Sequence, residues 1–287
     1  MEYVIKNECL KAVISSHGAE LRSLVDNDNL NRMNIPMPNT WNKVSPILFP
    51  QISKLPNSEY QVNGKKYYMT SHGFLRDNEL ELVYHYENEI RFRFSDNLQT
   101  KTIYPYHFIF FVTYRLVSNN LEVIFEVQNP FDGKIRFMLG AHPGFRIPLY
   151  EDEKFTDYYL EFEKKETAKR MVLKEGYLSN EYVCYLNQKK TIPLNHTLFL
   201  EDAIILRDLK SSYVDICSKN HQKKIRFYFS DFEILALWSK PNDDCNFLCL
   251  EPWNGIRKAM VIEHEKMGVL ELDANNSLVF EYKIMVI

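Results

Sequence analysis

The stretch Leu121-Glu122-Val123-Ile124-Phe125-Glu126-Val127 decides the fold class of this chain. Leucine, valine, phenylalanine and valine occupy every second position, and the two glutamates fall between them. An alternation with period two is typical of a strand that turns one face to the core and the other to water. The pattern therefore predicts a β-strand over residues 121–127.

Similar patterns predict further strands over residues 80–86, 90–94, 108–116, 224–229, 247–250 and 277–287. Turn pairs such as Asn63-Gly64 lie between many of them, and this one predicts a hairpin of residues 60–62 with 65–69. One short helix is expected from Glu163 to Arg170. The long amphipathic helices of a parallel α/β sheet are missing. We predict an all-β fold, two large antiparallel sheets packed face to face, as one domain over residues 1–287.

Composition narrows the class of protein. Of 287 residues, 45% are hydrophobic and 25% charged, and the net charge of −3 gives no reason to expect a nucleic-acid or membrane partner. No apolar run approaches the ~20 residues of a membrane span, and the first residues lack the pattern of a signal peptide. The five cysteines form no CxxC pair, which is typical of reduced thiols. We expect a cytoplasmic monomer or homodimer.

Three distant segments each carry one titratable side chain beside glycine, proline or aromatic residues. His72 lies in SHGFLRD (71–77), His142 in GAHPGF (140–145) and Glu251 in CLEPW (249–253). The proline after His142 predicts a strand end. Glu251 follows an apolar run, and partial desolvation there would raise its pKa and improve it as a proton acceptor near neutral pH. The alternatives are structural histidines and an edge glutamate.

Glycine is concentrated near these segments. The chain has only 9 glycines, and four of them (Gly73, Gly140, Gly144 and Gly255) fall in or just after the three segments. Unusual dihedral angles or close backbone approach would explain this, as would ordinary tight turns.

Other polar and aromatic residues have two interpretations each. Arg76 either forms a solvated ion pair with Asp77 or donates to ligand oxygens. Lys54 is either a site cation or simply solvated. The indoles of Trp41, Trp238 and Trp253 could stack on a sugar, although base rates favour core packing for at least two of them. HExxH, P-loop, GxGxxG and GxSxG motifs are all missing, so no metal or cofactor is expected.

The order of these motifs resembles the aldose 1-epimerase (galactose mutarotase-like) family, and within it the LacX-like branch. The similar segments are the proline-flanked LFP of residues 41–50, SHGFLRD, GAHPGF, LWSKP (237–241) with FLCLEPW (247–253), and the ending from Glu265 to Gly268. Five motifs in the same order cover nearly the whole chain.

The resemblance implies a β-supersandwich that interconverts the α and β anomers of a free aldose. It implies that Glu251 takes the proton of the anomeric hydroxyl, that a charged His142 protonates the ring oxygen, and that His72 steadies the developing charge. By the same resemblance, substrate-binding residues would be Arg76, Lys54, Trp253 and Asp202, with Glu201 as the alternative to Asp202.

Departures from the family pattern leave the substrate open. Arg146 follows Phe145 where a small polar residue is common, and Ile256-Arg257-Lys258 follows Gly255 where the branch more often has an acidic residue. Positive charge from Arg146, Arg76 and Lys54 would suit a hexose 6-phosphate. The alternatives to a hexose mutarotase are therefore a hexose-6-phosphate 1-epimerase and a non-catalytic sugar-binding or sensing protein.

Overall fold

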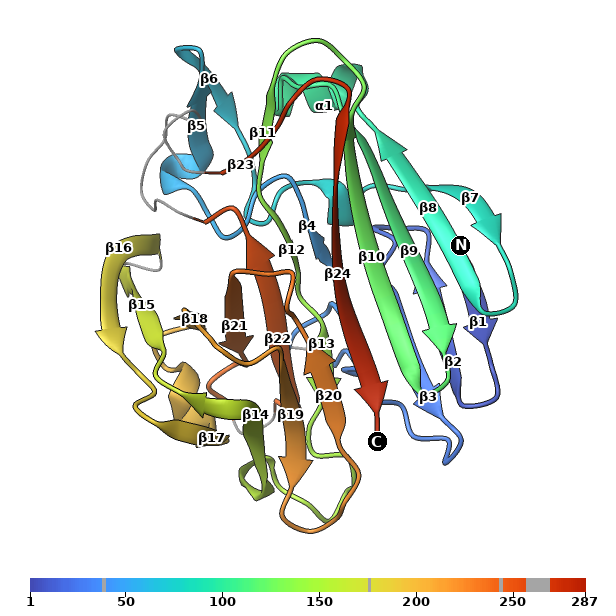
Figure 1. Cartoon of the computed structure of the whole chain (residues 1–287), viewed down its shortest axis with the longest axis vertical. Helices are drawn as coiled ribbons and strands as arrows, with labels where there is room; N and C mark the ends of the chain where they lie inside the picture. Colours follow the sequence, from blue (N-terminus) through green and yellow to red (C-terminus); the bar gives the residue numbers. More distant parts are fainter. Residues whose placement is uncertain (38–39, 175–176, 243–244, 257–268) are drawn as a thin grey trace.

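Two large antiparallel sheets dominate the computed structural model, which describes residues 1–37, 40–174, 177–242, 245–256 and 269–287 (Figure 1). The nine-stranded sheet has the order β17 (Lys189–Pro193), β14 (Tyr158–Glu166), β19 (Tyr213–Ser218), β20 (Ile225–Tyr228), β24 (Asn276–Val286), β10 (Asn120–Asn129), β9 (Ile109–Val117), β8 (Glu89–Ser95) and β7 (Glu81–His85). The eight-stranded sheet has the order β16 (Tyr177–Cys184), β15 (Lys169–Lys174), β18 (Ile204–Arg207), β21 (Ile234–Trp238), β22 (Phe247–Asn254), β12 (Leu139–Ala141) and β4 (Ile47–Leu48), and β13 (Gly144–Arg146) also pairs with β22.

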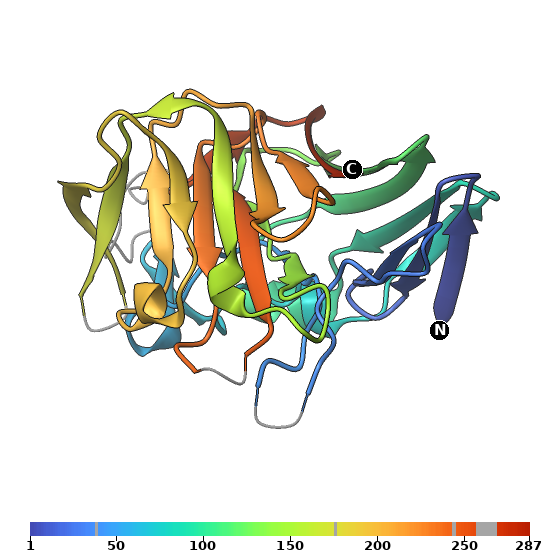
Figure 2. The ribbon, with the colours of Figure 1, turned by 90° about the horizontal axis from the view of Figure 1, so that it is seen from below.

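Smaller elements surround these sheets. They are a three-stranded sheet of β1 (Glu2–Lys6), β2 (Leu10–Ser15) and β3 (Leu21–Asp26), the ribbons of β5 (Glu59–Val62) with β6 (Lys65–Tyr68) and β11 (Ile135–Phe137) with β23 (Leu270–Leu272), the helix α1 (Leu98–Ile103), and the 3₁₀ turns η1 (Pro56–Ser58), η2 (Leu75–Asp77), η3 (Phe155–Asp157) and η4 (His196–Phe199). Seen from below, the blue N-terminal sheet lies beside the green strands of the nine-stranded sheet (Figure 2).

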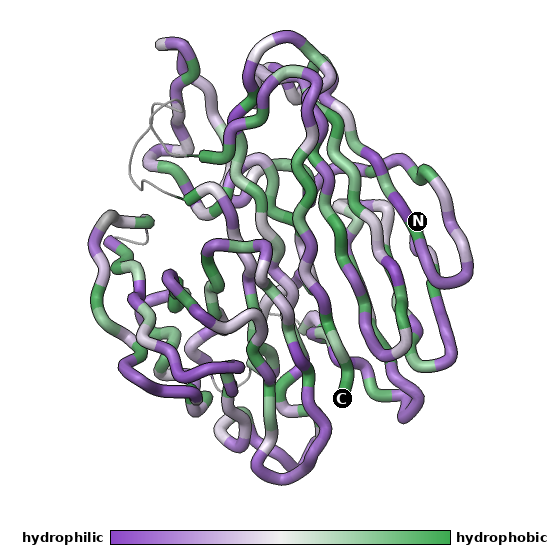
Figure 3. The backbone as a smooth tube through the Cα atoms, viewed as in Figure 1, coloured by the Kyte–Doolittle hydropathy of each residue, from purple (hydrophilic) through white to green (hydrophobic). Residues whose placement is uncertain are grey.

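The strand predicted over residues 121–127 is confirmed as the middle of β10. Leu121, Val123, Phe125 and Val127 are fully buried, and the residues between them are half-buried. Along such strands hydrophobic and hydrophilic residues alternate, and the turns at the lower edge are mainly hydrophilic (Figure 3). The hairpin at Asn63-Gly64 is also confirmed, as β5 and β6.

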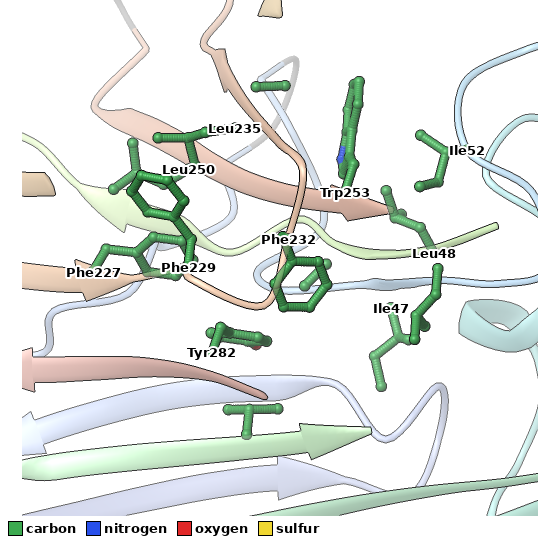
Figure 4. Close-up of a cluster of buried hydrophobic side chains, with 14 of the residues drawn as sticks. Ile47, Leu48, Ile52, Phe227, Phe229, Phe232, Leu235, Leu250, Trp253 and Tyr282 are labelled. Atoms are coloured by element: carbon green, nitrogen blue, oxygen red, sulfur yellow. The ribbon is translucent and has the colours of Figure 1, made fainter. Parts of the chain in front are cut away.

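The core lies between the two large sheets. Leu235 of β21 and Leu250 of β22 belong to the same buried cluster as Phe227 of β20 and Tyr282 of β24 (Figure 4). All four side chains are at most 1% exposed. The two sheets therefore pack face to face, as predicted.

The predicted helix from Glu163 to Arg170 is wrong, because these residues end β14 and begin β15. Their charge pattern suggests a helix, but the Glu166 carboxylate is fully buried and accepts hydrogen bonds from the Lys210 and Ser211 backbone amides. This tertiary contact outweighs the local helical preference. The helix α1 was not predicted; its signal is Asn97, whose side chain caps the amide of Thr100.

In the part of the chain that the structure describes, none of the helices has the length and apolar character needed to cross a membrane.

Candidate active site

Strand β22 carries the acidic group of the site. Its side chains alternate between the two faces of the sheet, and Leu248 and Leu250 point into the core. Glu251 and Trp253 therefore face the opposite side, and Figure 4 shows Trp253 on the side of β22 away from Tyr282. Glu251 pairs with Ala236 of β21, a residue with a small side chain.

His142 lies beside Glu251, between β12 and β13. Its backbone amide donates to Pro46 O at 3.0 Å, and Pro143 O accepts from the Leu250 amide at 3.1 Å, which fixes this turn against β22. His142 Nε2 then lies 3.2 Å from Glu251 Oε2. The strand-end position predicted from the following proline is confirmed.

Burial shifts the pKa values of both groups. His142 is 7% exposed and Glu251 1%. Burial, and then the nearby His72, lower the pKa of His142 well below 6.5. Burial, and then the Asp202 carboxylate, raise the pKa of Glu251 well above 4.5. Both shifts favour the uncharged form of the pair, in which Glu251 carries the proton and His142 is neutral, whereas the sequence interpretation assumed that both groups are ionised.

Aromatic rings surround the histidine. Trp41, from the segment between β3 and β4, stacks on His142 with ring centroids 4.7 Å apart and an interplanar angle of 30°. The Trp238 ring meets His142 edge-on at 5.5 Å. These contacts limit the motion of the imidazole and the access of water to it.

His72 presents a single hydrogen-bond donor to the same space. Its Nδ1 accepts from the Ser53 amide at 3.3 Å, and its own amide donates to Ser53 O at 3.0 Å. Burial, and then the charge of Arg76, lower the pKa of His72 to about 3. The ring is therefore neutral, with its proton on Nε2. Its centroid lies 5.7 Å from that of His142.

Two basic side chains and one carboxylate reach the site from other segments. Arg76 of η2 donates to Ser71 O at 2.8 Å, and its Nε lies 3.7 Å from Asp77, so it both pairs with Asp77 and lines the site. The exposed Lys54 lies over the Tyr177 ring at 4.8 Å. Asp202 precedes β18 with a positive φ of 80°.

These groups line one cavity of about 270 Å³, near the lower end of the range for small-molecule sites. Its walls consist of indole and histidine rings, charged groups and a few small or aliphatic side chains, contributed by Trp41, Ser53, Lys54, Ser71, His72, Arg76, His142, Leu173, Asp202, Ala203, Ile205, Trp238, Glu251 and Trp253. All seven residues predicted for the site are in this set.

Comparison with known proteins identifies the family. The family described as aldose 1-epimerase matches residues 1–267. The chain belongs to the aldose 1-epimerase family. It is 34% identical over 280 residues to the chromosomal protein LacX of Lactococcus lactis subsp. lactis, covering 94% of this chain and 92% of LacX. Membership in this family supports a general role as a sugar epimerase or mutarotase.

Solved structures agree with this assignment. A galactose mutarotase related enzyme from Lactobacillus acidophilus matches with a TM-score of 0.93 at 30% identity, covering 100% of this chain and 97% of that one. A galactose mutarotase-like protein from Lactobacillus casei matches with a TM-score of 0.93 at 28% identity over 100% of both chains.

The structure answers two questions that the sequence left open: which of Asp202 and Glu201 lines the cavity, and where Arg146 lies. Asp202, and not Glu201, lines the cavity; the Glu201 carboxylate is 83% exposed and lies 3.5 Å from Arg170. Arg146, on the same strand as Gly144, does not line the cavity of Glu251 and His142. It lines a second cavity instead. The expectation that Arg146 adds charge near Arg76 and Lys54 is therefore wrong. Arg257, Lys258 and the ending from Glu265 lie outside the described residues.

At three glycines near the site, neighbouring side-chain or backbone atoms pack too closely to leave room for a Cβ atom. A Cβ on Gly144 would lie 2.7 Å from the Trp41 ring, and one on Gly140 would lie 2.7 Å from the Trp253 ring. Gly73 has a φ of +75°, and a Cβ there would lie 2.2 Å from Phe49 O. The predicted need for close approach and unusual dihedral angles is confirmed.

A metal would have one candidate ligand set within the described ranges. Atoms of His142, Cys249 and Glu251 lie within 4.8 Å of one another. Burial raises the pKa of the Cys249 thiol well above 9.0, and the thiolate is the form that binds metals. A buried thiol that keeps its proton is a poor metal ligand, so this donor set fits a cation poorly.

Several lining residues were missed from the sequence. Ser53 has a positive φ of 60° and fixes His72 through both backbone groups, but a serine after an isoleucine gives no signal of that role. Leu173 and Ile205 are ordinary strand residues whose place in the cavity depends on how the strands pair.

Proposed function

We propose that this protein is an aldose 1-epimerase that interconverts the anomers of a free hexose by general acid–base ring opening. One observation carries the proposal: a buried carboxylate and a buried imidazole lie 3.2 Å apart at a cavity of monosaccharide size. Mutarotation requires two proton transfers, each worth about 10²–10⁴-fold in rate. Both groups that could make them are present.

The proposed steps use the proton that the pair shares. Sugar hydroxyls in the cavity would stabilise charge, so the proton moves from Glu251 to His142. Glu251 then takes the proton of the anomeric hydroxyl, and His142 protonates the ring oxygen while the C1–O5 bond breaks. After rotation about C1–C2, the aldehyde closes in reverse from its other face. No group enters or leaves, so one proton on the pair is sufficient.

The other lining groups would orient the sugar. The Nε2–H of His72 is a neutral donor suited to an oxygen that gains negative charge. Asp202 and Arg76 would bind ring hydroxyls as acceptor and donor. Trp253, 3% exposed and lining the cavity, offers an apolar ring edge to C–H groups of the sugar.

The test is polarimetry or NMR of freshly dissolved α-D-galactose and α-D-glucose. We expect the protein to accelerate equilibration, and Glu251→Gln to lower kcat/KM by about 10²–10⁴-fold with the fold intact. Circular dichroism of the variant controls for folding. If wild-type protein leaves the equilibration rate of both hexoses and of glucose 6-phosphate unchanged, the enzymatic proposal fails and a non-catalytic sugar-binding role replaces it.

A hexose 6-phosphate remains the second candidate substrate because of Lys54. This ammonium lines the cavity, and no carboxylate pairs with it among the described residues. Lys54→Gln should then reduce kcat/KM for glucose 6-phosphate far more than for glucose. An equal loss on both sugars would favour the neutral hexose. A single domain and a cytoplasmic monomer or homodimer remain predictions.

A further inference from the structure

A second cavity, of about 480 Å³, contains none of the residues that line the candidate active site. It lies where β13, η3 and η4 approach one another. Arg146 ends β13, Lys154 precedes η3, and His196 begins η4. The aldose epimerase reaction makes no use of these groups.

The backbone of Arg146 is held by strand pairing and a hydrogen bond, whereas its side chain has no polar partner among the described residues. Its strand pairs with Phe247 of β22, and its amide donates to Arg32 O at 3.0 Å. Arg146 is half-buried, and no described residue accepts a hydrogen bond from its guanidinium or forms an ion pair with it. A rigid strand thus holds five N–H donors at the cavity without an acceptor.

Two further donors at the cavity are also unused. The Lys154 amide donates to Asp157 Oδ2 at 2.9 Å, but its ammonium has no acidic partner in the described part of the chain. The His196 ring stacks on Phe155 with centroids 4.2 Å apart, and its buried Nδ1 lacks a hydrogen-bond partner. Stacking fixes the plane of the imidazole, so its nitrogens have a defined direction.

Two carboxylates, Glu151 and Glu153, also line this cavity, and within the described residues neither forms an ion pair with Arg146 or Lys154. The Glu153 carboxylate already accepts from Tyr158 and from Ser218 Oγ at 2.7 Å, and its Oε2 lies 3.4 Å from His221 Nε2. Glu151 is exposed to solvent. The groups of this cavity that lack a hydrogen-bond partner are therefore donors. An anion with several oxygens could accept hydrogen bonds from them.

We propose that this second cavity binds a phosphate-type oxyanion, either free or carried on a small molecule. The Arg146 guanidinium would bind two of its oxygens, a geometry that suits the planar fork of arginine. Lys154 and His196 would contact the remaining oxygens. The site is distinct from the cavity of the Glu251–His142 pair, because no residue lines both cavities.

Binding of inorganic phosphate at constant ionic strength, followed by calorimetry and NMR, tests the proposal. Wild-type protein should bind it saturably, and Arg146→Gln should raise Kd about tenfold or more, which corresponds to about 1.4 kcal/mol. Lys165→Gln, which removes one exposed charge from β14, is the control and should leave Kd unchanged, and Lys54→Gln shows whether phosphate binds in the first cavity instead. Constant ionic strength removes general screening effects.

Two results would overturn the proposal. Phosphate that fails to saturate the wild-type protein shows that the cavity has no such site. Phosphate binding that survives Arg146→Gln and is lost in Lys54→Gln assigns the anion to the first cavity. Glucose 6-phosphate separates the two sources when only the binding that Arg146→Gln weakens is counted. If that binding is tighter than for inorganic phosphate, the ligand is a phosphorylated small molecule; if it is equal or weaker, the ligand is free phosphate.

Discussion

The Trp41 indole is stacked on the His142 imidazole, with centroids 4.7 Å apart and an angle of 30° between the rings. Burial opposes protonation of this imidazole, whereas the face of an indole attracts a cation. The stack therefore favours the protonated histidine that the proposed ring opening requires. Trp41 would act through His142, as a positioning residue.

Trp41→Leu should lower kcat/KM on the order of tenfold, because a desolvated cation–π contact is worth about 1–2 kcal/mol. It should also move the acid limb of the pH profile to lower pH, since the protonated imidazole loses a stabilising contact. Trp41→Phe is the matched control, which retains a ring and should lose less. Identical profiles for wild type and Trp41→Leu would assign Trp41 to packing alone.

The pH profile of the wild-type protein should have a broad plateau. The active pair holds one proton; a second proton must go to His142, whose pKa lies well below 6.5. Loss of the shared proton requires Glu251 to ionise, and its pKa is raised well above 4.5. We therefore expect the acid limb of kcat/KM below pH 6.5. Stopped-flow polarimetry, corrected for spontaneous mutarotation, measures it, and an acid limb at or above 6.5 would contradict this description of the pair.

Asp202→Asn should raise KM for the sugar by about 10–100-fold, because hydrogen bonds to a charged group are worth about 1.5–3 kcal/mol. Asparagine keeps the size of the side chain and tolerates the positive φ of this position. Glu201→Gln is the adjacent control, which removes a surface ion pair with Arg170 and should leave KM unchanged. A larger effect from Glu201→Gln would reverse the assignment of the two carboxylates.

Gly73→Ala should destabilise the protein by on the order of 3 kcal/mol or more, since a Cβ would lie 2.2 Å from Phe49 O. Gly64→Ala is matched in backbone conformation, with the same φ of +75°, but a Cβ there meets no atom within 4 Å. It should cost only about 1–2 kcal/mol, the penalty of the left-handed conformation. Urea denaturation measures both, and equal losses would mean that the contact with Phe49 relaxes.

The sequence predicted the strands best where alternation extends over many residues, as in β10 and β24. It failed at Glu163 to Arg170, where a buried Glu166 is satisfied by the backbone of residues 210–211, some 45 positions away along the chain. His72, His142 and Glu251 were selected because glycine, proline or aromatic neighbours surround each one, whereas Asp202 was selected only by the resemblance to the family. Arg146 was misplaced for a related reason: adjacency to GAHPGF in sequence says nothing about which cavity a side chain enters.

The buried Glu251–His142 pair has a consequence for laboratory evolution of this protein. A carboxyl whose pKa rises on folding makes the folded state less favourable near neutral pH than a matched neutral side chain would, whereas an imidazole whose pKa falls has this effect only below about pH 6.5. Glu251→Gln should therefore melt at a temperature equal to or above that of the wild type. A screen that rewards heat resistance alone would accept substitutions of Glu251 and yield robust, inactive proteins.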